Sequence, residues 1–207
     1  PMRPLLIPKY TAFKLYALGV TSVSSVIVGR NHWLFLGKET DRIDERRYFL
    51  GANPFKENDL EQWRRVLTGR ERWLKQRGIA YLLVVVPNKS TVYPEHMPAA
   101  YPRGRSTRLD QLCGFIKRHA PGFPLLDLRP AMLAGKKKRT LYWPTDTHWN
   151  DFGLDLAYRQ IVRQLAARFP SLQAIPEDAF EARPCPPGSR DLEKMLLLPW
   201  KAPGPFF

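Results

Sequence analysis

The chain has 207 residues, 44% of them apolar, six tryptophans and a formal net charge of +14. This length suits one domain with a sizeable core, and the apolar content excludes an intrinsically disordered chain. The excess of Lys and Arg favours anionic partners such as nucleic acid, anionic lipid or acidic polysaccharide, although a generally basic surface explains it equally well. The basic residues are scattered, and no zinc-finger, RNP or KH signature accompanies them, so we expect no nucleic-acid binding.

The N-terminal part predicts an irregular arm over residues 1–25, followed by one domain over residues 26–207. The apolar stretch from Tyr16 to Val28 is interrupted by Gly19 and by several Ser and Thr residues. It is therefore too short and too polar to cross a bilayer. Because the sequence shows no secretory signal, we expect either a cytoplasmic protein or one whose leader lies outside this sequence.

The first elements of the domain are two short strands and a long helix. Apolar runs at 26–28 and 33–36 predict strands around a turn at 29–32. Residues 38–56 are polar and charged and indicate a loop with a short helical turn. A helix is expected from Asn58 or Asp59 to about Arg77. We expect its inner side to carry Leu60, Trp63, Leu67, Trp73 and Leu74.

A parallel sheet is predicted in the middle of the chain. The continuous apolar run 79–86 is typical of a strand that is buried on both faces. A proline-containing loop, a helix over about 106–119 and a second buried strand at 124–128 follow. Strand, helix and strand in this order form a βαβ unit, so we predict an α/β sandwich. A last long helix is expected over about 151–169.

The two cysteines do not define a site. Cys113 and Cys185 match no metal motif in their spacing, and Cys113 lies in an amphipathic segment where it is expected as a small buried side chain. A disulfide between them stays open, because the sequence does not place their Cβ atoms. We expect neither a metal nor a cofactor.

Polar residues follow the strongest predicted strand directly. In a parallel α/β sheet, functional loops gather beyond the carboxyl ends of the strands. Asn88 offers an amide and Lys89 a cation at such an end, and together these groups can hold an oxyanion or an anionic sugar. The alternative interpretation is an ordinary polar turn.

The segment Asp146-Thr147-His148-Trp149-Asn150 carries the most specific chemistry. General-base catalysis needs a neutral imidazole whose second nitrogen is held by an acceptor, and Asp146 is placed to accept that N–H from His148. Asn150 is a suitable N-cap for the last helix, which puts His148 just outside it. A capping cluster, a structural histidine or half of a metal site remain as alternatives.

Three segments in order make the chain resemble the alginate O-acetyltransferase group of SGNH-hydrolase-like proteins, the AlgJ/AlgX type. They are residues 26–36, residues 86–95, and residues 145–150 with Gly153. The resemblance implies an SGNH-hydrolase-like three-layer sandwich with a parallel central sheet, and a periplasmic enzyme that acetylates hydroxyls of an exopolysaccharide. It implies an anionic polysaccharide as substrate and an acetyl donor, supplied for example by a membrane acyltransferase. Asp146 and His148 match the catalytic acid and base positions of the family.

The same resemblance implies a nucleophile that this sequence does not contain. In the family the serine lies in a later Gly-Asp-Ser segment, and the present sequence ends at Phe207 before one appears. We therefore expect a domain truncated at its C-terminal side and inactive on its own. A non-catalytic polysaccharide-binding or assembly protein of the same fold is the alternative. The other serines considered are Ser22, Ser24, Ser25, Ser90 and Ser189.

Overall fold

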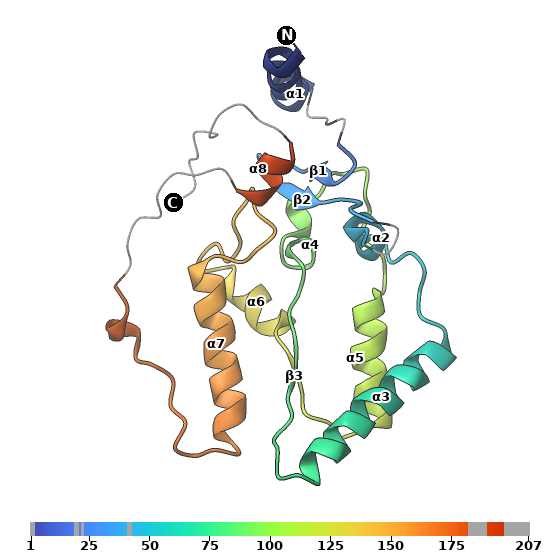
Figure 1. Ribbon diagram of the computed structural model, residues 1–207, viewed down its shortest axis with the longest axis vertical. Coiled ribbons are helices and arrows are strands. Elements are labelled where there is room, and N and C mark those ends of the chain that lie inside the picture. Colours follow the sequence, from blue (N-terminus) through green and yellow to red (C-terminus); the bar gives the residue numbers. More distant parts are fainter. Residues whose placement is uncertain (1–2, 19–20, 22, 41–42, 182–189, 197–207) are drawn as a thin grey trace.

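The computed structural model describes residues 3–18, 21, 23–40, 43–181 and 190–196. Figure 1 shows helices beside two small sheets, which have two strands each among the described residues, with helix α1 (Arg3–Leu18) at one tip. Across the described ranges, every helix is too short or too polar to traverse a lipid bilayer.

Helix α1 corrects the expectation of an irregular arm over residues 1–25. The segment contains good helix formers such as Ala12, Leu15 and Leu18, whose weak individual propensities add up over four turns. The side chain of Leu15 packs against a small apolar cluster of buried residues from the first two strands and the last helix. The members of this cluster are Val26, Leu34, Leu192 and Leu196.

The predicted pair of short strands is confirmed as an antiparallel hairpin. Strand β1 (Val26–Val28) pairs with strand β2 (Leu34–Leu36). At the turn, Trp33 N donates to Arg30 O at 3.1 Å, and Asn31 and His32 both have positive φ. Positive φ at both central residues matches the right-handed twist of the strands. The turn delivers Trp33 and Phe35 to the core, where both rings are buried.

Two helices follow the hairpin. Helix α2 (Glu45–Phe49) is the short helical turn expected in the polar segment, and Asp44 caps it by accepting from Arg47 N. Helix α3 (Glu57–Lys75) buries Leu60 and Leu67. The expectation for its two tryptophans is wrong, because Trp63 and Trp73 are exposed. Burial follows the seven-residue spacing of Leu60 and Leu67, which keeps one stripe of the helix inward.

The predicted βαβ unit is confirmed. Strand β3 (Leu83–Val85) and strand β4 (Leu125–Asp127) run parallel, with Val84 opposite Leu126, and helix α5 (Arg108–His119) connects them. Figure 1 shows β3 between two helix pairs, α3 with α5 on one side and α6 (Arg129–Gly135) with α7 (Asp151–Ala166) on the other.

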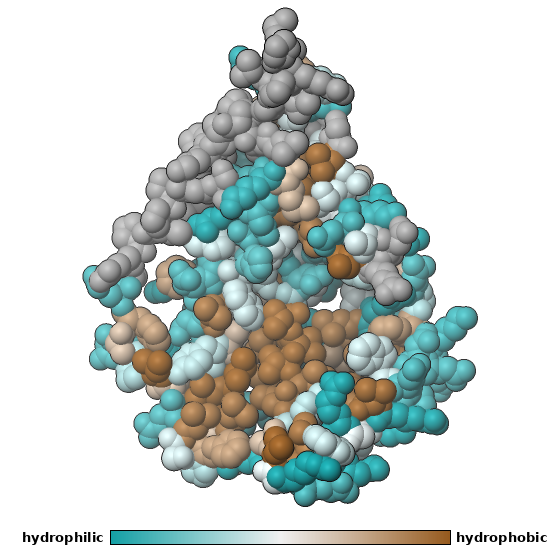
Figure 2. All heavy atoms as spheres, in the orientation of Figure 1, coloured by the Kyte–Doolittle hydropathy of each residue, from teal (hydrophilic) through white to brown (hydrophobic). Residues whose placement is uncertain are grey.

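Strand β3 is shorter and more open than expected. The apolar run 79–86 forms a strand only at 83–85, all three strand residues are half-buried, and Ile79 and Val86 are exposed. Full burial on both faces was therefore a wrong expectation for β3. Within the described residues β3 pairs with β4 alone, and Figure 2 shows an apolar surface across the middle of the molecule, where β3 runs.

The remaining short elements connect these layers. They are α4 (Lys89–Val92), the 3-10 turns η1 (Pro94–His96) and η2 (Glu177–Ala179), and α8 (Asp191–Met195). The main core joins the hairpin to α2, α4, α6 and α7 around residues such as Phe35, Val92, Leu128 and Met132. Cys113 is buried in α5 as a free thiol, whereas Cys185 lies outside the described residues.

Candidate active site

The loop that carries Asp146 and His148 is closed at its base by the start of α7. Asn150 caps this helix by accepting from Gly153 N at 3.0 Å, and its backbone N–H donates to Leu141 O. Gly153 lies so close to this base that a β-carbon there would collide with the Leu141 carbonyl. The start of α7 is thus packed directly onto the loop. The prediction of Asn150 as the N-cap of this helix is confirmed.

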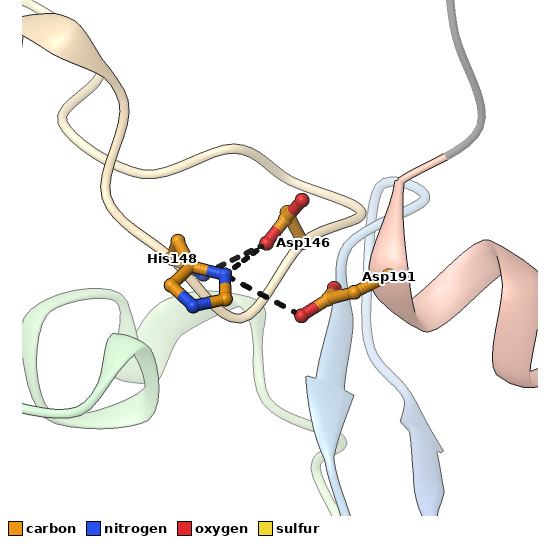
Figure 3. A group of neighbouring side chains, drawn as sticks. All are labelled: Asp146, His148 and Asp191. Carbon is orange, nitrogen blue, oxygen red and sulfur yellow. Dashed lines mark hydrogen bonds and ion pairs between the residues drawn. The ribbon is translucent and has the colours of Figure 1, made fainter.

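The structure brings Asp146 and His148 into contact. Oδ1 of Asp146 accepts from the backbone N–H of His148 at 3.0 Å and lies 2.7 Å from Nδ1 of its ring. This i to i+2 bond from the side chain makes the loop an Asx-type turn. The imidazole is 76% exposed, and Figure 3 shows its second nitrogen directed away from the carboxylates.

The carboxylate of Asp146 is ionised in this arrangement. Burial opposes its charge, but the hydrogen bonds from the backbone and ring of His148, together with the Asp191 backbone, hold its pKa below the ordinary value. An ionised acceptor at Oδ1 assigns the N–H of the ring to Nδ1. This tautomer leaves Nε2 of His148 with a lone pair that can take a proton.

A third side chain, which the sequence did not indicate, completes the group. Asp191, at the start of α8, accepts from Thr147 N at 2.9 Å and from the Thr147 hydroxyl, and its Oδ2 lies 3.6 Å from Nδ1 of His148. Figure 3 shows the carboxylates of Asp146 and Asp191 directed at the same ring nitrogen of His148. Thr147 and Asp191 are 44 residues apart, so only the folded chain reveals their contact.

Lys89 lies beneath the same loop and is almost completely buried. Its ammonium donates to three backbone carbonyls, those of Trp143, Pro144 and Asp146. Since an ammonium has three donors, these bonds use all of them. The geometry therefore favours a positioning role for Lys89 over the predicted contact with substrate.

Asn88 lies at a pocket and not at the loop that Lys89 binds. It is exposed at the start of α4 and lines a pocket of about 350 Å³ between α2, α4 and α5. Arg103 and Arg108 lie in the same wall, beside apolar side chains including Phe49 and Leu112. Helix α4 thus separates Asn88, at the pocket, from Lys89, at the loop.

The described serines lie elsewhere. Ser90 is buried in α4, where its backbone N–H donates to Glu45 Oε1 at 3.3 Å. Ser24 and Ser25 accept backbone bonds from Lys38 and Gly37 beside the hairpin. Ser22 and Ser189, the other serines considered, lie outside the described residues.

The group of Asp146, His148 and Asp191 has two chemical interpretations. Each residue offers one possible metal-ligand atom, and these three atoms lie within 4.8 Å of one another, a spacing at which they could share a cation. However, Nδ1 of His148 is already at hydrogen-bonding distance from Asp146, and the loop supplies N–H donors to both carboxylates. We therefore interpret the group as an acid–base cluster.

The sequence also matches a family model. Residues 26–205 match the SGNH hydrolase-like domain of the acetyltransferase AlgX. This match covers most of the chain, including the hairpin, the β3–α4 loop and the Asp146–His148 loop. The chain belongs to this family. All three segments on which the resemblance to the AlgX-type family was based lie within the matched residues.

Individual relatives agree with this assignment. The chain is 30% identical over 179 residues to the probable alginate O-acetylase AlgJ of Pseudomonas fluorescens, and 28% identical over 159 residues to that of Pseudomonas aeruginosa. These alignments cover 84% and 76% of this chain but only 41% and 37% of the relatives. The chain thus spans less than half the length of these AlgX-type relatives.

A solved structure shares the fold. The O-acetyltransferase domain of Pseudomonas putida AlgJ superimposes with a TM-score of 0.53 at 19% identity, over 83% of this chain and 58% of that one. With the family match, this superposition shows the predicted SGNH-hydrolase-like α/β fold. The prediction of a truncated domain is not tested by this superposition.

Proposed function

We propose that the chain is the part of an O-acetyltransferase that supplies the acid–base pair for acetyl transfer to a polysaccharide hydroxyl. The contact between Asp146 Oδ1 and His148 Nδ1, at 2.7 Å, carries this proposal. It leaves Nε2 free on an exposed ring whose Nδ1 is held by an ionised carboxylate. Membership of the AlgX-type family and the names of the AlgJ relatives support acetyl transfer as the reaction.

The proposed reaction has two steps. A serine hydroxyl gives its proton to Nε2 of His148 while its oxygen attacks the acetyl carbonyl of the donor, and the donor's leaving group takes that proton as it departs. A sugar hydroxyl then gives its proton to Nε2 and attacks the acetyl-serine, and the serine oxygen recovers the proton. We propose that this serine lies in a Gly-Asp-Ser segment outside the present sequence, as the family resemblance implies.

The proposed substrate is an anionic polysaccharide such as alginate. The net charge of +14 favours polyanions, and Arg103 and Arg108 beside Asn88 offer donors to a sugar carboxylate in the pocket next to α4. Asn88 is thus the proposed substrate contact. We place the reaction in the periplasm, with a membrane acyltransferase supplying the acetyl group, because the AlgX-type relationship implies both.

The test is transfer of acetyl from an activated ester to oligouronates by the product of the complete gene. His148→Ala and Asp146→Ala should each lower the transfer rate about a thousandfold or more, because removing a base or its orienting carboxylate has effects of this order. His119→Ala is the matched control, since His119 is exposed at the end of α5 and its ring contacts only Phe115 among the ring contacts described. Unchanged transfer by His148→Ala would refute the proposal.

A second function is favoured by the surface charge alone. A basic domain in which His148 hydrogen-bonds to Thr147 and Asp146, and to no serine among the described residues, can serve as a polysaccharide-binding or assembly protein. This candidate predicts salt-sensitive binding of oligouronates without turnover of an activated ester, in the complete gene product as well. Acetylated oligouronate in that reaction would exclude it.

A further inference from the structure

The loop that carries Asp146 has few strong bonds of its own. Its internal backbone bonds, Asp146 N to Trp143 O and Trp143 N to His148 O, are both 3.3 Å long. The bonds from the Lys89 ammonium to the carbonyls of Trp143, Pro144 and Asp146 are shorter, at 3.1, 2.9 and 2.6 Å. Bonds from a charged donor are also stronger than neutral ones, so Lys89 is a principal anchor of the loop.

The position of the Lys89 ammonium is itself fixed from below. It lies 5.0 Å from the centroid of the Phe35 ring and 5.6 Å from that of Trp33, both delivered by the β1–β2 hairpin. Aromatic faces attract a cation at these distances. The hairpin also binds the loop directly, because Leu34 N donates to Pro144 O at 2.9 Å. The aromatic floor, the ammonium and the loop therefore form one stack.

We propose that Lys89 is the positioning residue of the acid–base pair: by binding three loop carbonyls it holds the Asp146 carboxylate against His148. Lys89 does not contact the reacting atoms in this role. Its 2.6 Å bond goes to the carbonyl of the same residue whose carboxylate accepts from His148. A shift of this carbonyl would therefore move the carboxylate as well. The effect on acetyl transfer rests on the proposed function, whereas the effect on the loop does not.

The charge of Lys89 makes the anchor sensitive to pH. Burial lowers the pKa of Lys89 to about 7, against the opposing influence of the carboxylates of Glu45 on α2, Asp191 on α8 and Asp146 in the loop. A neutral amine has two N–H donors where the ammonium has three. As the pH rises through about 7, at least one of the three carbonyl bonds must therefore weaken.

The experiment uses NMR on the 207-residue chain, so that no enzymatic activity is needed. Two signals are followed: exchange of the His148 backbone amide, which donates to Asp146 Oδ1, and titration of the Asp146 carboxyl carbon. In Lys89→Met the His148 amide should exchange about tenfold faster or more, because a bond to a charged group is lost. The pKa of Asp146 should also rise toward its ordinary value.

Lys136→Met is the matched control. The ammonium of Lys136 also donates to a backbone carbonyl, that of Val92, and to Glu95, but it does not touch the loop. This variant should leave both signals unchanged. If a folded Lys89→Met keeps the exchange rate of the His148 amide, Lys89 does not position the pair, even if the titration of Asp146 shifts through the lost charge.

A second measurement keeps Lys89 unsubstituted, so that the proposal can still be tested if Lys89→Met does not fold. The side-chain carbon next to the Lys89 amine and the amides of 143–148 are titrated between pH 6 and 9 in a His148→Asn background, which removes the imidazole titration. The chemical shifts of the loop amides should change with the same midpoint pH as the signal of the Lys89 side chain. Separate midpoints for the loop and the lysine would overturn the proposal.

Discussion

Lys89 has almost no contact with solvent, and all three donors of its ammonium are hydrogen-bonded. A buried ammonium is costly unless each donor is satisfied, and here backbone carbonyls rather than carboxylates accept all three. The nearby carboxylic acid of Glu45 is itself buried, and this burial raises its pKa. The charge of Lys89 is therefore supported by the three loop carbonyls that accept its hydrogen bonds and by the nearby carboxylates of Glu45, Asp191 and Asp146.

This burial predicts a specific pH dependence of stability. The folded state releases the proton of Lys89 near pH 7, whereas the unfolded chain keeps it to about pH 10. Between these values the unfolded state binds more protons, so the contribution of Lys89 to the free energy of unfolding increases with pH. Relative to Lys89→Met, the wild-type chain should gain on the order of 1–3 kcal/mol from pH 7 to 9.

Urea unfolding of both chains at several pH values measures this difference. The raised pKa of Glu45 works in the opposite direction, since the folded state then holds a proton that the unfolded state has lost. The burial that raises this pKa is common to both chains, but Lys89→Met also removes a charge that lowers it, so Glu45 is titrated separately in each chain. A difference that does not change with pH would show that the ammonium titrates alike in the folded and unfolded states.

At the scale of elements, the site is assembled by the ends of short segments. Helix α7 begins at the base of the loop, α8 contributes Asp191, α4 contributes Lys89, and the hairpin forms the floor. Each of these segments is too short or too polar to be stable alone. Their mutual contacts, rather than local propensity, therefore hold the acid–base pair.

Gly153 tests how tightly α7 is joined to the loop. In Gly153→Ala the added methyl group would collide with the carbonyl of Leu141, which also accepts from Asn150 N. We expect a loss of about 1–3 kcal/mol in the free energy of unfolding, as for other overpacked sites. Thermal and urea unfolding measure this loss.

Gly114→Ala is the control for the intrinsic effect of alanine in a helix. Gly114 lies inside α5 with open space where a β-carbon would be. This variant should gain up to about 1 kcal/mol, because alanine favours the helix. Equal stabilisation by both substitutions would mean that α7 can move away from the loop without cost.

Local sequence signals predicted those elements whose causes are local. The turn at 29–32, the N-cap Asn150 and the alternation of strand and helix from β3 to β4 all depend on neighbouring residues. The burial of β3 and of Trp63 was wrongly predicted because it depends on what packs above them. The roles of Lys89 and Asp191 depend on partners more than forty residues away, and no periodic pattern encodes such a contact.

At the scale of the whole molecule, one face of the sheet region is apolar. Figure 2 shows apolar side chains gathered over the centre of the molecule, and Ile79 and Val86 at the two ends of the β3 segment are each 48% exposed. Contiguous apolar surface of this kind marks an interaction site or a tendency to associate. The present chain spans 58% of the matching AlgJ domain.

The exposed Ile79 and Val86 predict that the 207-residue chain binds hydrophobic dyes and self-associates with increasing concentration. Replacing Ile79 and Val86 together by Lys should reduce both, which dye fluorescence and sedimentation measure. The control replaces Tyr10 and Phe13 by Lys, since these residues are exposed on α1, at the tip of the molecule away from β3. If both pairs of substitutions act equally, association reflects general hydrophobicity and not the exposed residues of the β3 segment.

The stack of aromatic floor, ammonium and loop also limits how the acid–base pair can be transplanted. A designer who copies residues 145–150 into another scaffold obtains the side chains of the pair but not the carbonyl-binding cation below them. Functional groups retain their geometry only when their supporting contacts are transferred with them. The smallest portable version of this site therefore includes the hairpin, the residues from Asn88 to Val92, the loop and Asp191, drawn from distant parts of the sequence.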